Sequence, residues 1–182
     1  KGQILVIKAF QKLVSKYQST NVRLAVLSDG REHNRLINYA QDNHLGSLVT
    51  FTGWLANRED TFAYYSQADV FMYASLFECG GYVVVEAMSC GLPVICVDLG
   101  GPGDSIDGSC GIRVAAISPD QVVNDMAHAM FELYEDREKT RNLSRGALKK
   151  IENWFDWETK GERIGHIVQD VLFPNQAVSQ QK

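Results

Sequence analysis

The sequence has few cysteines, and none of them stands at the spacings that hold a structural metal or a small disulfide framework. The four cysteines, at positions 79, 90, 96 and 110, include no C-x-x-C pair. Cys79, Cys90 and Cys96 have apolar or glycine-rich surroundings, which predicts buried, reduced thiols. Because free thiols persist in reducing compartments, the sequence favours a cytoplasmic protein without a metal site.

Long apolar runs and basic stripes are also missing. No run approaches the roughly 20 residues that span a bilayer, and the start at Lys1 does not resemble a signal peptide. The 18 Lys and Arg residues are outnumbered by 22 Asp and Glu residues, and they are scattered along the chain. A general nucleic-acid binder is therefore not expected, because it needs a basic surface for the phosphates.

What the sequence does contain is an alternation of short apolar runs with helical patterns. Strands are predicted at 22–27, 48–52, 69–73, 93–97 and 111–114. Helices are predicted around residues 6–17, 31–43, 58–67, 82–89, 119–135, 138–153 and 157–172. Nearly continuous apolar strands between helices are typical of a parallel sheet covered on both faces, so the fold class is α/β and Rossmann-like.

The predicted domain organisation follows from the same pattern. Residues 1–173 are expected to form a single domain, large enough to bury roughly 70% of the surface of its unfolded chain. The Gln- and Ser-rich residues 174–182 are predicted to be a disordered tail. Doubly wound sheets normally open with a strand and this chain opens with a helix, so a first strand is expected upstream of Lys1.

Ligands of such sheets bind beyond the carboxyl ends of the strands. Four loops follow those ends: Ser28-Asp29-Gly30, Gly53-Trp54-Leu55, residues 77–81, and Gly100-Gly101-Pro102-Gly103. The last is either a turn or a phosphate cradle, and it lacks the G-x-G-x-x-G spacing of a dinucleotide site. All four carry glycine or polar groups, so this edge of the sheet is the predicted binding site.

Two carboxylates, Glu78 and Glu86, are separated by seven residues in the stretch that follows the third strand. Glu78 is predicted to lie in the loop and Glu86 about one turn inside the next helix. Gly80 and Gly81 would let an anion approach the free amides and the positive dipole at the start of that helix. The carboxylates themselves would repel an anion, and they are suited to accept hydrogen bonds from sugar or ribose hydroxyls.

The Glu-x₇-Glu stretch continues into Glu-Ala-Met-x-Cys-Gly-x-Pro-Val, and the whole resembles the signature of group 1 (family 4) retaining glycosyltransferases. The resemblance implies the C-terminal, donor-binding half of a GT-B fold. It implies that Glu86 binds the ribose and that Glu78 is the catalytic, sugar-facing carboxylate. The intervening backbone would hold the sugar and the diphosphate at Cys79, Gly80, Gly81, Tyr82 and Val83.

Other segments share the resemblance in the right order. Lys1-Gly2 is similar to the end of an Arg-x₄-Lys-Gly element whose cations neutralise the diphosphate. Ser28-Asp29-Gly30 is similar to the family's Gly-Asp-Gly turn, and Trp54 and Leu55 stand where the family lines its nucleobase pocket. Phe155-Asp156-Trp157-Glu158 resembles the start of the family's last helix. Gly80 departs from the family because an aromatic residue is common there, and Asp104 replaces a glutamate.

The resemblance implies a retaining hexosyltransferase whose donor is a nucleoside-diphosphate sugar. The acceptor, a glycan or a lipid-linked molecule, would be bound by an N-terminal domain outside this chain, which could also contact the cytosolic membrane face. The sequence has no Asp-x-Asp motif after a strand, so neither a metal nor another cofactor is expected. Two alternatives remain: an epimerase or phosphorylase on the same fold, and a non-catalytic interaction module.

Overall fold

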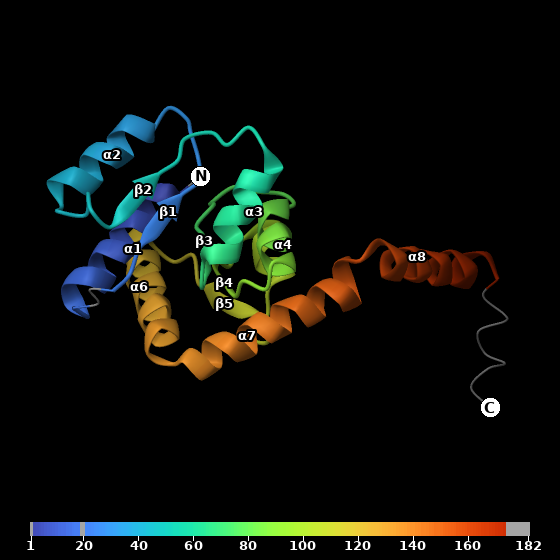
Figure 1. Cartoon of the computed structure of the whole chain (residues 1–182). Coiled ribbons are helices and arrows are strands. Elements are labelled where there is room, and N and C mark those ends of the chain that lie inside the picture. The colour runs from blue at the N-terminus through green and yellow to red at the C-terminus, as the bar shows by residue number, and fades with distance from the viewer. Residues whose placement is uncertain (1, 19–20, 174–182) are drawn as a thin grey trace.

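The computed structural model describes residues 2–18 and 21–173; Lys1 and the predicted tail at 174–182 lie outside the described residues. Five strands alternate with helices in the order that the sequence predicts (Figure 1). The strands are β1 (Leu24–Val26), β2 (Val49–Phe51), β3 (Phe71–Tyr73), β4 (Val94–Val97) and β5 (Gly111–Val114). The helices are α1 (Gln3–Lys16), α2 (His33–Asp42), α3 (Arg58–Gln67), α4 (Tyr82–Ser89), α5 (Gly100–Ser105), α6 (Pro119–Glu135), α7 (Arg137–Lys150), the π-helical turn η1 (Ile151–Phe155) and α8 (Trp157–Leu172).

All strand pairs in the described residues are parallel, as predicted, but they form two sheets instead of one. β1 pairs with β2, and β4 lies between β3 and β5. Helix α1 bridges the two sheets because its two flanks enter different clusters. Leu5 and Val6 pack with the three-stranded sheet, whereas Phe10 and Leu13 pack with Val26 and Val49 of the two-stranded sheet.

Strand β4 is the centre of the larger sheet, and all four of its residues are buried. Its side chains alternate between two faces, as strand geometry requires. Ile95 and Val97 join the cluster formed with α1 and α6, and Val94 and Cys96 join the cluster formed with α4 and α7. Helices therefore cover both faces of the sheet, and the Rossmann-like prediction is confirmed.

Side-chain caps explain where three C-terminal helices begin. Ser118 accepts a hydrogen bond from the amide of Gln121 at the start of α6, and Asp136 accepts one from Lys139 at the start of α7. Asp156 accepts one from the amide of Glu158, so α8 begins at Trp157 as predicted. Such caps contribute about 1 kcal/mol each to helix stability.

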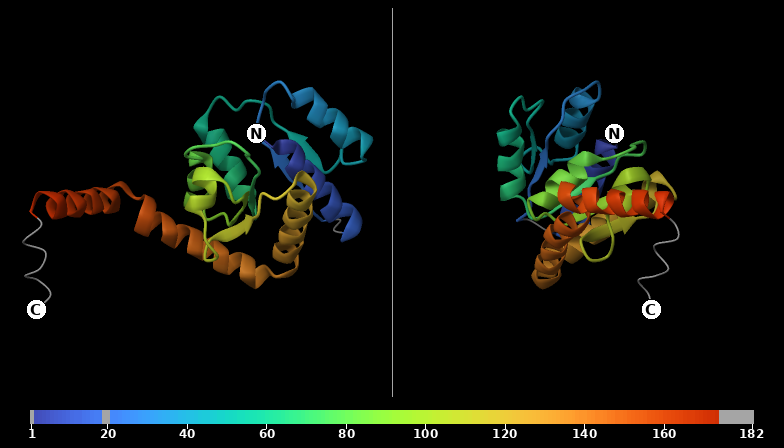
Figure 2. Two further views of the ribbon diagram at one scale, coloured as in Figure 1. Left: turned by 180° about the vertical axis from the view of Figure 1, so that it is seen from behind. Right: turned by 90° about the vertical axis from the view of Figure 1, so that its right-hand side faces the viewer.

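Helix α8 extends away from the body of the molecule in Figure 1 and in the left view of Figure 2. It has no buried residue. Arg163 ties it to η1, since its guanidinium lies 3.9 Å from the centre of the Trp154 ring and donates to the carbonyl oxygen of Asn153. Within the described part of the chain, no helix is both long enough and apolar enough to cross a membrane.

Candidate functional site

The loop between β3 and α4 carries the first carboxylate and ends at a glycine that no other residue could replace without strain. Gly81 caps α4 with a left-handed backbone, at φ 60°. A Cβ atom at this position would lie 2.5 Å from Cγ of Pro102. Because left-handed backbone costs other residues about 1–2 kcal/mol, position 81 requires glycine on two grounds.

Gly100-Gly101-Pro102-Gly103, for which the sequence predicts a turn or a phosphate cradle, instead form most of the short helix α5. This helix packs directly against the loop at 78–81. The amide of Gly101 donates to the carbonyl oxygen of Cys79 at 3.0 Å. Cβ atoms at Gly100 and Gly101 would lie 2.3 Å and 2.1 Å from the carbonyl oxygens of Glu78 and Cys79. The glycines therefore allow the close approach that supports the loop.

Glu78 is half-buried and accepts a hydrogen bond from the hydroxyl of Tyr73, the last residue of β3, at 2.9 Å from its Oε2 atom. Burial and the neighbouring carboxylate raise the pKa of the Tyr73 phenol to about 12. Tyr73 therefore keeps its proton throughout the physiological range and acts as a donor to Glu78.

Glu86 lies within α4, on the side that faces α3. The Nη2 atom of Arg58, the first residue of α3, donates to its Oε1 atom at 3.2 Å. The guanidinium of Arg58 also lies over the ring of Phe62, 5.2 Å from its centre. The pair is open to solvent, with 70% of the Arg58 side chain and 34% of the Glu86 side chain exposed. Sequence reasoning missed Arg58, because nothing in the local pattern indicates that these two helices meet there.

The loop after β1 lies beside the start of α1. Nε2 of Gln3 donates to the Ser28 hydroxyl at 3.1 Å, and the Asp29 carboxylate accepts from the amide of Gly30 at 2.7 Å. At the same end, Gly2 packs so tightly on the residue after β3 that a Cβ atom there would lie 1.8 Å from the carbonyl oxygen of Ala74. The first turn of α1 therefore connects the loops that follow β1 and β3.

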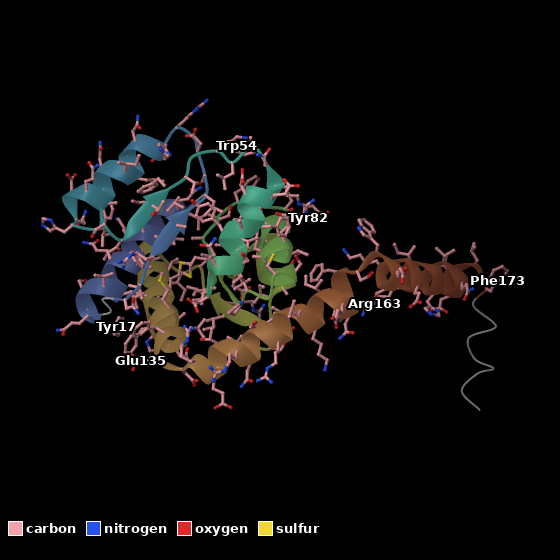
Figure 3. All side chains as sticks on the ribbon, viewed as in Figure 1. Tyr17, Trp54, Tyr82, Glu135, Arg163 and Phe173 are labelled. Atoms are coloured by element: carbon pink, nitrogen blue, oxygen red, sulfur yellow. The ribbon has the colours of Figure 1, made fainter. Side chains whose placement is uncertain are left out.

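Trp54 and Leu55 lie in the loop after β2. Trp54 is 80% exposed, whereas Leu55 is half-buried. Figure 3 shows Trp54 and Tyr82 at the end of the body that is remote from Tyr17 and Glu135. Tyr82, the first residue of α4, is 76% exposed, and its ring lies beside Gly80, where a Cβ atom would be 3.1 Å from Cε2 of the ring.

The cysteine prediction is only partly right. All four thiols are free, and Cys96 and Cys110 are buried. Cys90 is only half-buried. Cys79 is exposed because it belongs to a surface loop, residues 76–80, most of which is exposed. Burial raises the pKa of the Cys96 thiol to about 12. In the ranges that the structure describes, no group of three His, Cys, Asp or Glu side chains could hold a metal ion.

The arrangement is suited to a ligand that combines an anion with hydroxyl groups. The first amides of α4 have no acceptor within the helix and carry the positive end of its dipole. Gly80 and Gly81 lead into these amides, and one carboxylate lies before the helix and the other within it. Lys1, the predicted cation, lies outside the described residues.

Comparison with known proteins identifies the class and then the family. The fold is the Rossmann-like α/β fold of GT-B glycosyltransferases. Residues 1–150 match the family described as glycosyl transferases group 1. The chain belongs to this family, as the sequence motifs indicate.

Curated relatives include sucrose synthase 6 of Arabidopsis thaliana, 31% identical over 119 residues, which are 61% of this chain and 13% of that protein. D-inositol 3-phosphate glycosyltransferase of Paenarthrobacter aurescens is 29% identical over 161 residues, 87% of this chain and 38% of that protein. A GDP-mannose-dependent mannosyltransferase of Corynebacterium glutamicum is 26% identical over 176 residues, 93% of this chain and 44% of that protein. The chain thus spans less than half the length of these relatives.

Solved structures agree on the fold. Sucrose-phosphate synthase from Thermosynechococcus elongatus aligns with a TM-score of 0.69 at 26% identity, over 91% of this chain and 42% of that one. Anabaena HepE, solved in complex with UDP and glucose, aligns with a TM-score of 0.74 at 24% identity, over 93% of this chain and 45% of that one.

Proposed function

We propose that residues 1–173 form the donor-binding domain of a retaining glycosyltransferase and bind a nucleoside-diphosphate sugar. The observation that carries this proposal is the start of α4, where free amides and a glycine with a left-handed backbone stand between Glu78 and Glu86. A diphosphate needs the amides, and the sugar and ribose hydroxyls need the carboxylates. The UDP and glucose in the HepE structure support the same ligand class.

In the proposed mechanism the diphosphate lies on the amides of Gly81, Tyr82 and Val83, with Lys1 as its counter-ion. Glu86 accepts hydrogen bonds from the ribose, and Glu78 faces the transferred sugar. As the glycosidic bond breaks, the diphosphate gains negative charge, and preorganised amides stabilise that charge without reorganisation. The acceptor hydroxyl attacks from the same face of the sugar and gives its proton to an oxygen of the departing diphosphate, so the anomeric configuration is retained, and no metal is required.

The remaining donor contacts come from the other loops. Ser28, Asp29 and Gly30 would border the diphosphate, and Trp54 and Leu55 would border the nucleobase. Cys79 and Gly80 would contact the sugar through their backbone. The names of relatives include a GDP-mannose-dependent enzyme, while HepE was solved with UDP, so both bases must be tested.

Several properties of the whole protein belong to the same proposal. An N-terminal domain would bind a glycan or lipid-linked acceptor at the cytosolic face of a membrane. Taken alone, the donor domain would bind the nucleotide sugar and transfer little or none of the sugar.

Calorimetric titration with UDP, GDP and ADP, with and without EDTA, tests the proposal. We expect one of the three nucleotides to bind selectively, with an affinity that EDTA does not change. Binding that disappears with EDTA would contradict metal independence. No binding of any nucleotide would contradict the donor-site assignment and favour an interaction module.

A further inference from the structure

Tyr73 lies outside the Glu-x₇-Glu stretch and contacts Glu78 with its side chain. Its hydroxyl donates to Oε2 of Glu78 at 2.9 Å. Glu78 stands in a surface loop in which Leu76 and Phe77 are 54% and 92% exposed. Tyr73, by contrast, belongs to a strand, and its backbone pairs in register with the buried Cys96 of β4.

The ring of Tyr73 is also held by its neighbours. It stacks on Phe71, with 6.1 Å between ring centres and 17° between planes. Phe71 in turn meets the buried Tyr65 edge to face at 5.6 Å. The ring packs against the buried cluster that includes Val84 and Met88 of α4. The position of the phenol oxygen is therefore set by the core, not by the loop.

We infer that Tyr73 is a positioning residue: its hydroxyl fixes the orientation of the Glu78 carboxylate toward the transferred sugar. This inference rests on the proposed function of Glu78 as the sugar-facing carboxylate. A carboxylate in an exposed loop samples several rotamers, and a charge-assisted hydrogen bond from a fixed donor restricts them. Because burial and Glu78 hold the pKa of Tyr73 at about 12, the donor is present at every physiological pH.

The test separates binding of the sugar from binding of the nucleotide. Dissociation constants are measured for the probe pairs UDP and UDP-glucose, GDP and GDP-mannose, and ADP and ADP-glucose. The quantity of interest is the affinity of the sugar conjugate relative to the bare diphosphate. Tyr73→Phe keeps the ring and removes only the hydroxyl, so it should lower this ratio about tenfold, the size of one hydrogen bond to a charged group.

Tyr39→Phe is the matched control. Tyr39 is a half-buried tyrosine of α2 whose hydroxyl donates to Oε1 of Gln11 at 2.5 Å, in a contact between α1 and α2. Its loss should leave the ratio unchanged. The effect of Tyr73→Phe on the ratio is also measured in a Glu78→Ala background, where no carboxylate remains to be positioned. There, Tyr73→Phe should alter the ratio less than about twofold, because the effect acts through Glu78.

The outcomes distinguish the inference from the proposed function. If Glu78→Ala lowers the ratio and Tyr73→Phe does not, the inference is wrong and the role of Glu78 stands. An equal loss from Tyr73→Phe with and without Glu78 would also overturn it, since the hydroxyl would then act independently. If Glu78→Ala leaves the ratio unchanged, or if no probe pair binds, the sugar-facing role fails and the inference fails with it.

Discussion

The two sheets of this domain support their loops in different ways. In the three-stranded sheet, β4 is completely buried, and α5 packs under the loop at 78–81 through contacts that only glycine allows. In the two-stranded sheet, each strand has three residues, Ala25 and Thr50 are exposed, and the loop at 53–55 carries a largely exposed tryptophan. The loop that carries Glu78 is thus supported by close packing, whereas the loop that carries Trp54 stands at the surface.

The difference between the two sheets is tested most strongly by substituting two glycines that have nearly the same backbone φ angle. Gly81 has φ 60° and a Cβ atom there would meet Pro102, whereas Gly53 has φ 67° and a Cβ atom there would meet nothing within 4 Å. Gly81→Ala should cost about 2–5 kcal/mol of unfolding free energy, from strain plus overpacking, and should abolish nucleotide binding. Gly53→Ala should cost about 1–2 kcal/mol from strain alone. Urea unfolding of both variants checks the difference, and equal costs would show that Pro102 does not constrain position 81.

The next largest effect is expected for Glu86→Ala. Loss of hydrogen bonds from the ribose to a charged group should weaken nucleotide binding about ten- to a hundredfold. Asp29→Ala, in a loop of the smaller sheet, should weaken nucleotide binding less than about tenfold, because the Asp29 carboxylate already accepts a hydrogen bond from the amide of Gly30. Calorimetry with the bound nucleotide measures both. Wild-type affinity in Glu86→Ala would disprove the ribose assignment.

A smaller effect is expected for Trp54→Ala. If the nucleobase stacks on this ring, affinity should fall about tenfold, and the loss should be similar for pyrimidine and purine nucleotides because every base has a π face. Stability should change by less than about 0.5 kcal/mol, since Trp54 is 80% exposed. Trp157→Ala, at an 83% exposed position on α8, is the control and should change neither quantity.

The smallest effect is expected for Arg58→Gln, which removes the ion pair between α3 and Glu86 of α4. Exposed ion pairs contribute about 0.2–1 kcal/mol, so nucleotide affinity should fall about two- to fivefold, and the difference from wild type should shrink at high salt. Arg137→Gln removes a comparable exposed pair with Asp69, at 2.6 Å, and should leave affinity unchanged. Tighter binding in Arg58→Gln would mean that the arginine competes with the ribose.

Much of the fold was predictable because its signals are local. The apolar run at 93–97 is β4 with its start shortened by one residue, and the Asp156 cap places the start of α8 correctly. The family and the positions of Glu78 and Glu86 relative to α4 also follow from residues that are close in sequence. Such signals need no knowledge of tertiary packing.

The features that the sequence did not reveal depend on contacts between distant segments. Residues 100–105 are helical although they begin with two glycines, because the helix packs on the loop at 78–81. The pairing of Arg58 with Glu86 joins residues 28 positions apart. The two sheets are bridged by α1, whose residues pack on strands far apart in the sequence. In each case tertiary packing overrides or adds to local preference.

The central claim is that a nucleoside diphosphate binds at the start of α4, and backbone amide NMR tests it most directly. Titration of the ¹⁵N-labelled chain with UDP, GDP and ADP should shift the amide signals of Gly81, Tyr82 and Val83 in a saturable way for one of the three. The signals of α8 should stay in place. Saturable shifts confined to other segments, with these three amides unchanged, would contradict the account.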